Sequence, residues 1–305
     1  GDKVICVDAS LLPLFERIRP LLKTVDHVIV YPDDGAAVDP AVGLDYEELL
    51  RNTAPAVGYP DIDENDALGM CYTSGTTGNP KGVVYSHRAV VLHTLMQVSS
   101  DLLGMRSQDV VLAIVPLFHA NAWGFPYAGV MTGAKMVWPG SFMQPEDLAG
   151  LIQSEQVTFV GGVPTIIGGL YQFLKTSPNQ HDVSSLQTIA VGGAACPQAL
   201  MEGFRRDFGV WITHAWGMTE TAPIGTICNL KPHLTVAPYP EELSYRLKQG
   251  LPVPFVQLRI VDEAGKVLPH DGKVFGELQV RGPWIASAYY DDPRSAESFQ
   301  DGWFR

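Results

Sequence analysis

The sequence has 305 residues, of which 46% are hydrophobic, enough for one large domain or two modest ones with a substantial buried core. Its 33 acidic and 21 basic residues leave a formal net charge of −12, which excludes a global basic surface for nucleic acid or an anionic membrane. The four cysteines are widely spaced without a CxxC pair, which argues against a zinc ribbon or a dense disulfide framework. Without a signal-peptide pattern or an apolar run of membrane-spanning length, a soluble cytoplasmic protein is expected.

The first part of the chain predicts a βαβ beginning and then a surface connection. Apolar residues recur at helical spacing between Leu11 and Leu22, with a strand-like run on either side. Residues 33–66 are rich in acidic residues, proline and glycine, which is typical of a connection, with one short helix over 45–50. Ser86 can cap a helix over 87–100. The strands are expected at 5–7, 25–31 and 67–72.

The middle of the chain alternates short β-rich runs with helical patterns. Strands are expected at 110–116, 134–139, 157–164, 186–193 and 210–217. Helices are expected near 122–132, 145–154, 165–175 and 197–208. This alternation predicts an α/β fold, with mainly parallel β-sheets layered with helices. From about Phe255, two alternating runs joined by turn residues predict a β-rich subdomain, so we divide the chain into an α/β part at 1–254 and a β-rich part at 255–305.

The segment 73–82 reads TSGTTGNPKG and directly follows one of the predicted strands. Its glycines let backbone amides turn toward an anion, its hydroxyl groups add donors, and Lys81 adds a positive charge. A polyphosphate fits this set at the end of a strand. The segment is not a Walker A loop, because Pro80 stands where the second glycine is required and Gly82 follows the lysine. On composition alone, a flexible solvent loop remains the alternative.

Six motifs in order give this segment a more specific meaning. The run YTSGTTGNPKGVVYSHRA resembles the signature loop of the adenylate-forming superfamily, which contains acyl-CoA synthetases, firefly luciferase and the adenylation domains of peptide synthetases. The other matches are PLFHANAW at 116–123, VGGAACP at 191–197, HAWGMTETAP at 214–223, GELQVRGPWIASAYY at 276–290 and DGWFR at 301–305. Within the superfamily, VVYSHRA, FHANAWGFPY and HAWGMTE are most similar to bacterial medium- and long-chain fatty acyl-CoA synthetases.

This resemblance implies an ATP-dependent fatty acid–CoA ligase that works in two steps. A carboxylate attacks the α-phosphate of ATP to give acyl-adenylate and pyrophosphate, and the thiol of coenzyme A then attacks the mixed anhydride. The implied substrates are a fatty acid, ATP and coenzyme A, and the implied cofactor is Mg²⁺. Similar long-chain synthetases can dimerise, so a homodimer stays open, as does peripheral contact with a membrane.

The resemblance also assigns residues to the phosphates and the metal. Glu220 matches the glutamate associated with Mg²⁺, and Thr219 would hydrogen-bond the α-phosphate. His119 matches the histidine beside the carboxylate and the α-phosphate. Together with Lys81 these three form the candidate catalytic set, and Thr73 is a second candidate metal contact. The loop that grips the β- and γ-phosphates is Thr73, Ser74, Gly75, Thr76, Thr77, Gly78 and Lys81.

Further residues are assigned to adenine. The strand end at Gly192, Gly193 and Ala194 resembles the backbone that approaches the base. Trp216 replaces the more usual tyrosine, which keeps the stacking surface but loses a phenolic hydrogen bond. The other side of the adenine site would be lined by His214, Ala215 and Trp216, and Gly217 and Met218 are further candidate cofactor-binding residues.

The acyl chain would lie beside Trp123, which resembles the tryptophan that gates the acyl tunnel in long-chain enzymes. The small and apolar residues Gly161, Gly162, Val163, Pro164 and Thr165 suit a tunnel wall, although buried packing explains them nearly as well. His87 and His93 are interpreted as structural residues, because a spacing of six does not suggest a metal pair.

Family members continue after the DGWFR motif with a ribose-binding aspartate and a small C-terminal domain. We therefore expect this chain to be a fragment of the large N-terminal domain, with little ligase activity by itself. Two alternatives stay open: a ligase for an aryl or amino acid, and a nucleotide- or acyl-binding module without catalysis. Residues 159–170 contain no acidic residue to bind a substrate ammonium group, which mildly favours an uncharged acyl chain.

Overall fold

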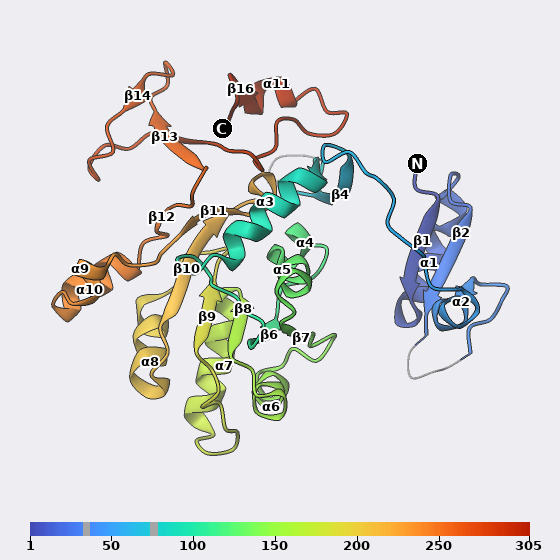
Figure 1. The fold of residues 1–305 in the computed structure, drawn as a ribbon, viewed down its shortest axis with the longest axis horizontal. Coiled ribbons are helices and arrows are strands. Elements are labelled where there is room, and N and C mark those ends of the chain that lie inside the picture. The colour runs from blue at the N-terminus through green and yellow to red at the C-terminus, as the bar shows by residue number, and fades with distance from the viewer. Residues whose placement is uncertain (33–36, 74–78) are drawn as a thin grey trace. The chain divides into compact units, whose positions relative to one another are not determined.

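The computed structural model describes residues 1–32, 37–73 and 79–305. The chain divides into two compact units, Gly1–Ile62 and Asp63–Arg305 (Figure 1). This boundary differs from the subdivision after residue 254 that the sequence predicted. Of the predicted phosphate loop, residues 74–78 lie outside the described residues.

The first unit contains the predicted βαβ arrangement. Its three strands form a parallel sheet in the order β1-β2-β3, and the predicted helix between Leu11 and Leu22 is broken into three short pieces. Pro13 and Pro20 each stand in the first turn of a new piece, because proline lacks the N–H that would continue the preceding helix. The elements are β1 (Val4–Asp8), η1 (Ala9–Leu11), α1 (Leu12–Ile18), η2 (Arg19–Leu21), β2 (His27–Tyr31), β3 (Leu44–Asp45) and α2 (Tyr46–Asn52).

The second unit is organised around a seven-stranded sheet in the order β12-β11-β10-β9-β8-β6-β7. The five strands from β10 to β7 in this order are parallel, which confirms the predicted architecture. The sequence did not predict β11 and β12, which pair antiparallel at one edge. The strands are β6 (Val110–Ala113), β7 (Lys135–Val137), β8 (Phe159–Gly162), β9 (Thr188–Val191), β10 (Ile212–Gly217), β11 (Ile224–Ile227) and β12 (Leu251–Pro252).

Helices cover both faces of this sheet. In β6, Leu112 packs into the core formed with α6, α7 and α8, whereas Val111 and Ala113 pack beside Phe125 of α5. Successive side chains of a strand point to opposite faces, so the two clusters are the two layers of the core. Figure 1 shows α6, α7 and α8 grouped together. The helices are α3 (His87–Val98), α5 (Phe125–Thr132), α6 (Pro145–Glu155), α7 (Pro164–Thr176), α8 (Gln198–Phe208), α9 (Pro232–Thr235) and α10 (Tyr239–Arg246).

A two-stranded hairpin carries the ends of the predicted phosphate loop. β4 (Ala67–Tyr72) pairs antiparallel with β5 (Gly82–Ser86), and only the first of these strands was predicted. Ser86 then caps α3, as predicted, because its Oγ accepts a hydrogen bond of 3.1 Å from the amide of Ala89. The hairpin and the start of α3 are thus fixed together.

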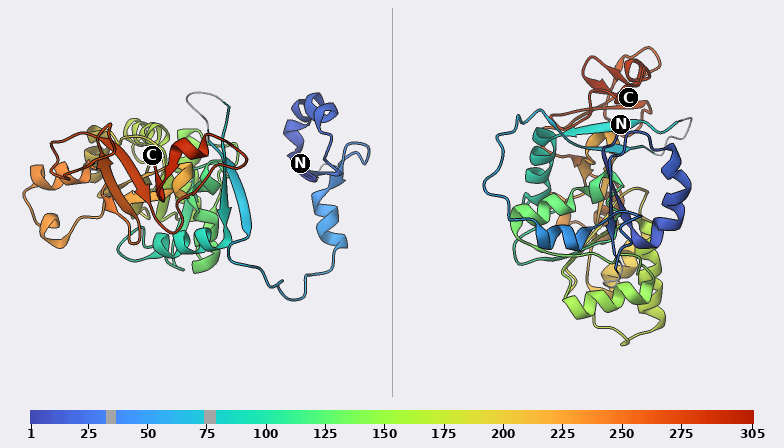
Figure 2. Two further views of the ribbon diagram at one scale, coloured as in Figure 1. Left: turned by 90° about the horizontal axis from the view of Figure 1, so that it is seen from above. Right: turned by 90° about the vertical axis from the view of Figure 1, so that its right-hand side faces the viewer.

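A five-stranded antiparallel sheet follows the larger one, in the order β14-β13-β15-β17-β16. All of its strands lie after Phe255, where the sequence predicted a β-rich region. In the right-hand view of Figure 2, these orange-to-red strands lie at one end of the second unit. The elements are β13 (Gln257–Val261), β14 (Val267–Leu268), β15 (Glu277–Arg281), α11 (Ser295–Ser298), β16 (Phe299–Gln300) and β17 (Trp303–Phe304).

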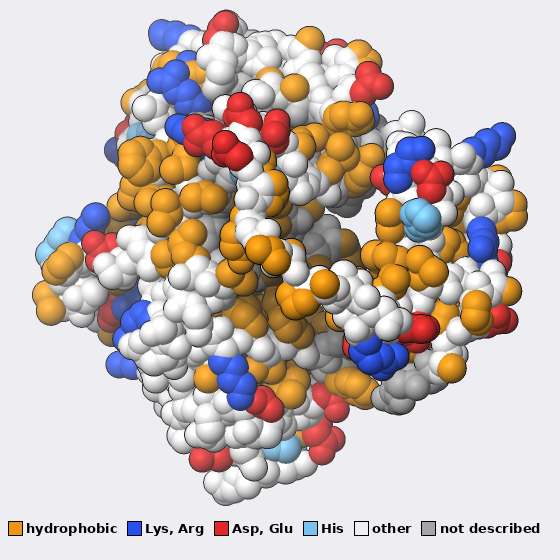
Figure 3. Space-filling model, turned by 45° about the vertical axis from the view of Figure 1, so that its right-hand side comes forward, with side chains coloured by type: hydrophobic (Ala, Val, Ile, Leu, Met, Phe, Trp, Pro, Cys, Tyr) orange, Lys and Arg blue, Asp and Glu red, His pale blue; other side chains and the backbone are white. Residues whose placement is uncertain are grey.

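The surface carries charges of both signs, and the face drawn in Figure 3 shows lysine and arginine scattered among acidic and apolar side chains. An exposed ion pair of 3.0 Å joins Arg88 to Glu64, and such pairs stabilise a protein only slightly. Across the described ranges, no helix has both the length and the apolar character needed to cross a membrane.

Candidate active site

A cavity of about 670 Å³ lies in the second unit at the carboxyl ends of β9 and β10. Residues 190–193 from the first of these strands and residues 215–220 from the second form one wall. The lining also contains Thr73 and Lys81, at the two ends of the predicted phosphate loop, and Tyr289. Open α/β sheets bind ligands at this edge, so the fold and the cavity agree on the position of a site.

The cavity brings together most of the predicted site residues that the structure describes. Its lining includes Thr73, Lys81, His119, Trp123, Gly192, Gly193, Ala215, Trp216, Gly217, Met218, Thr219 and Glu220. The predicted residues Ser74, Gly75, Thr76, Thr77 and Gly78 lie outside the described residues. Among the described ones, Ala194, His214 and 161–165 do not line this cavity. Their proposed ligand contacts stay predictions.

Those last residues have visible packing roles. His214 is buried, and its Nε2 lies 3.3 Å from the carbonyl oxygen of Ala194, so it ties the end of β9 to β10. Burial lowers the pKa of His214. A Cβ on Gly161 would lie 2.3 Å from the ring of Phe125, and one on Gly162 would lie 3.2 Å from Ile167. The two glycines let helices pack onto β8, which is the packing alternative that the sequence left open.

The turn after β10 holds Thr219 and Glu220 by their backbones. A Cβ on Gly217 would lie only 1.8 Å from the carbonyl oxygen of Pro223, so this close approach requires glycine. The hydroxyl of Tyr85 donates a 2.6 Å hydrogen bond to the carbonyl of Thr219, and the amide of Ala286 donates a 2.8 Å bond to that of Glu220. Two distant segments therefore fix the position of the Thr219–Glu220 pair.

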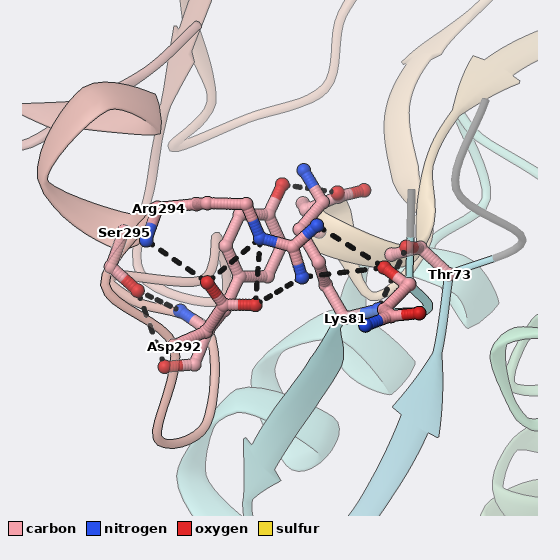
Figure 4. Close-up of polar contacts among 8 residues, drawn as sticks. Thr73, Lys81, Asp292, Arg294 and Ser295 are labelled. Atoms are coloured by element: carbon pink, nitrogen blue, oxygen red, sulfur yellow. Dashed lines mark hydrogen bonds and ion pairs between the residues drawn. The ribbon is translucent and has the colours of Figure 1, made fainter. Parts of the chain in front are cut away.

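The side chain of Glu220 is buried and is held by Tyr289. The Tyr289 hydroxyl donates a 2.7 Å hydrogen bond to Oε1 of Glu220, and the Lys81 Nζ lies 4.2 Å from the centroid of the same ring (Figure 4). Burial, reinforced by the bond to Glu220, raises the pKa of Tyr289, so its hydroxyl is a donor at neutral pH. The motif at 276–290 contains Tyr289 but gave it no role, because its partners Lys81 and Glu220 are more than 60 residues away.

A second set of polar contacts ties the Tyr289 segment to the phosphate-loop end. The guanidinium of Arg294 donates to the carbonyl oxygen of Asn79 at 3.2 Å and also to Asp292 at 2.8 Å (Figure 4). Arg294 lowers the pKa of Asp292 to about 2. The Oγ of Ser295 accepts a 2.9 Å bond from the amide of Tyr289. This segment therefore contacts the chain just before Lys81 as well as Lys81 itself.

His119 precedes an unusual backbone turn, and Trp123 is the last residue of that turn. α4 (Ala120–Trp123) has positive φ angles of 45–56° throughout, and the regular helix α5 begins at Phe125 rather than near 122 as predicted. Left-handed conformation costs L-residues about 1–2 kcal/mol each. Two tertiary bonds support the turn: Cys71 Sγ donates to Asn121 at 3.1 Å and Gln97 Nε2 donates to the Trp123 carbonyl at 3.2 Å.

A magnesium ion fits this site only if it is shared with a substrate. In the part of the chain that the structure describes, no group of three or more His, Cys, Asp or Glu residues could hold a metal. Glu220 is the only carboxylate among the described residues of the lining. Mg²⁺ is commonly held by one or two carboxylates together with substrate phosphates and water. Glu220 would therefore suit Mg²⁺ bound jointly with the phosphates of a substrate.

The described geometry agrees with the comparisons with known proteins. The family model described as AMP-binding enzyme matches residues 3–290. The chain belongs to this AMP-binding enzyme family. The chain is 44% identical over 306 residues to a long-chain-fatty-acid–CoA ligase of Thermus thermophilus, covering 100% of the chain and 55% of that relative. It is 43% identical to a 3-methylmercaptopropionyl-CoA ligase of Ruegeria pomeroyi, covering 99% of the chain and 56% of the relative.

The fold of the chain also matches that of a solved structure. It matches a long-chain-fatty-acid-CoA ligase from Archaeoglobus fulgidus with a TM-score of 0.83 and 25% identity, over 99% of this chain and 59% of the other. The predicted superfamily and its α/β fold are thereby confirmed. The chain spans about half the length of the curated relatives it matches.

Proposed function

We propose that the complete protein is an AMP-forming fatty acid–CoA ligase and that the described cavity is its adenylation site. The observation that carries this proposal is the meeting of Lys81, the Thr219–Glu220 pair and His119 in one cavity. A cation and hydroxyl donors suit a triphosphate, and a single buried carboxylate suits a shared Mg²⁺. The named fatty-acid ligases among the relatives support the same reaction class.

In the first half-reaction, the substrate carboxylate oxygen bonds to the α-phosphorus of ATP, and the bond to the β-phosphate oxygen breaks. Lys81 holds the departing phosphates, and the Thr219 hydroxyl donates to the α-phosphate. Glu220 would hold Mg²⁺, which would supply positive charge to the triphosphate. His119 donates a hydrogen bond where negative charge shifts from the carboxylate to the phosphate.

In the second half-reaction, the sulfur of coenzyme A bonds to the acyl carbonyl carbon, AMP leaves, and the thiol proton passes to solvent. The nucleotide base lies against the strand end at Gly192 and Gly193, with Trp216 offering an aromatic face. Trp123 lies at the border of this region, because a Cβ on Gly192 would be only 3.4 Å from its ring. We place the acyl chain on the far side of Trp123.

The apolar lining favours an uncharged acyl chain. Leu103, Phe125 and Ile224 border the cavity, and the only described carboxylate in its lining is already assigned to magnesium. An amino acid substrate would need a partner for its ammonium group. An aryl acid or a short acid such as 3-methylmercaptopropionate remains the second candidate substrate, because one of the similar relatives is named for the latter.

Pyrophosphate release by the complete gene product tests the proposal. We expect release with fatty acids of graded chain length and none with amino acids. Release restricted to benzoate, amino acids or 3-methylmercaptopropionate would overturn the fatty-acid assignment. Binding of ATP without pyrophosphate release with any of these acids would favour a module without catalysis.

A further inference from the structure

We infer that Tyr289 is a positioning residue that keeps Lys81 and Glu220 apart and in place, so that one binds phosphate and the other binds magnesium. This inference rests on the proposed function. It adds a residue to which the resemblance assigned no role. It explains how the charges of Lys81 and Glu220 are kept from pairing with each other. An ammonium and a carboxylate in one partly enclosed site attract each other strongly, and a direct pair would compete with both ligands.

The hydroxyl of Tyr289 fixes one oxygen of Glu220. Both side chains are buried, with exposed fractions of 4%, and the hydrogen bond of 2.7 Å reaches Oε1. Among the described residues, Oε2 has no hydrogen-bond partner. A phenol donates only one proton, so this bond holds the carboxylate without adding a charge to it. The orientation leaves Oε2 as the oxygen for a cation.

The ring of Tyr289 fixes Lys81. The Nζ lies 4.2 Å from the ring centroid, which is the distance of a cation–π contact. Within the described ranges, no ion pair joins Lys81 to Glu220. The same side chain thus contacts the cation with its ring face and the carboxylate with its hydroxyl. A neutral spacer of this kind holds both groups without consuming either charge.

Backbone contacts hold the spacer itself. The amide of Tyr290 donates a 2.8 Å bond to the carbonyl of Gly82, immediately after Lys81, and Arg294 contacts Asn79, two residues before it. Ser295 accepts from the amide of Tyr289. The segment is therefore tied to the hairpin on both sides of Lys81, which makes the ring position a property of the fold.

Three variants of the complete gene product separate the two halves of this role. Tyr289→Phe removes the hydroxyl and keeps the ring, whereas Tyr289→Leu removes both. Tyr290→Phe removes the neighbouring hydroxyl from an exposed ring and is the matched control. The readout is the dissociation constant of ATP by calorimetry with and without Mg²⁺, with thermal melting to check folding.

We expect magnesium to tighten ATP binding by the wild type. In Tyr289→Phe this tightening should fall by about 10- to 100-fold, the value of a hydrogen bond to a charged group, while ATP affinity without Mg²⁺ stays near the wild type. Tyr289→Leu should also weaken ATP binding without Mg²⁺. Tyr290→Phe should match the wild type in both conditions.

A second substitution tests whether Tyr289 acts through Glu220. In a Glu220→Gln background, Tyr289→Phe should change magnesium-dependent ATP binding by less than about 2-fold, because the two changes share one interaction. Wild-type magnesium dependence in Tyr289→Phe, or additive effects in the double variant, would overturn the inference while pyrophosphate release by the wild type still supported the proposed function. Absence of pyrophosphate release by the wild type would instead defeat the proposed function.

Discussion

The two sides of the cavity are built by different means. The side formed by β9 and β10 relies on main-chain contacts, such as the approach of Gly217 to Pro223 and the backbone bonds to Thr219 and Glu220. The side formed by the hairpin and the Tyr289 segment relies on side chains, chiefly Tyr289 and Arg294. The first construction leaves no room for an added methyl group at Gly217, whereas the second depends on the particular side chains that hold it.

The largest expected effect comes from the group that both sides meet, Glu220. Glu220→Gln preserves shape but removes the charge, and it should reduce the rate of pyrophosphate release by about 10²–10³-fold, as loss of one electrostatic stabiliser does. Single-turnover kinetics with saturating ATP would measure this. An unchanged rate would remove Glu220 from the proposed mechanism.

The main-chain side should be sensitive to one added methyl group. Gly217→Ala should lower the free energy of unfolding by about 3 kcal/mol, because the new Cβ meets a backbone oxygen that cannot move alone. Gly168→Ala is the matched control, since it lies in α7 with nothing within 4 Å of its Cβ position and should be neutral or stabilising. Equal stability of the two variants in urea unfolding would refute this contrast.

The buried residue His93, next to Ile224 in the cavity lining, should make the stability of the protein sensitive to acid. The Nε2 of His93 accepts a 3.3 Å bond from the amide of Ile224, and burial lowers the His93 pKa from 6.5 to about 3. Below pH 6.5 the unfolded chain binds a proton that the folded chain refuses, so stability falls as pH falls from 6.5 toward 3. At pH 5 the free energy of unfolding is lowered by about 2 kcal/mol through this group.

The comparison variant is His93→Gln. Urea unfolding at pH 7 and pH 5 should show a smaller loss of stability on acidification in the variant than in the wild type. If the two proteins lose the same free energy between these pH values, His93 is not the group responsible.

The smallest effect on activity is expected from Arg294, which belongs to the side of the cavity that is held by side chains. This guanidinium is partly exposed and its contacts to Asp292 and Asn79 are screened by solvent. Arg294→Gln should raise the KM for ATP by roughly 2- to 5-fold, with the difference shrinking in high salt. Steady-state kinetics would measure the KM for ATP. A change in this KM as large as the loss of rate expected for Glu220→Gln would contradict the minor role assigned to Arg294.

The sequence predicted the elements whose signals are local. The parallel strands, the Ser86 cap and the residues of the cavity wall follow from periodicity, capping chemistry and motifs read within a few residues. The left-handed turn at Ala120–Trp123 could not be predicted this way, because it depends on Cys71 and Gln97. Strand β11 was missed for a related reason, since its short apolar run gains meaning only when paired with β10.

In the candidate site, too, residues with a local sequence signal were predicted and a residue that depends on distant partners was not. Lys81 and Glu220 were predicted from motifs, but the residue that contacts both was not, because Tyr289 is distant from each in sequence and its motif suggested no chemistry. The glycines at 161 and 162 show the reverse case. Their small size suggested a tunnel wall, with buried packing as the alternative. In the structure it accommodates the side chains of Phe125 and Ile167, and the tunnel wall stays a prediction.

Product analysis of the complete gene product with a fatty acid, ATP and coenzyme A tests the proposed reaction most directly. Mass spectrometry should find AMP, pyrophosphate and acyl-CoA in equal amounts, and acyl-adenylate when coenzyme A is omitted. Formation of ADP and phosphate in place of AMP and pyrophosphate would contradict an adenylation site in this cavity.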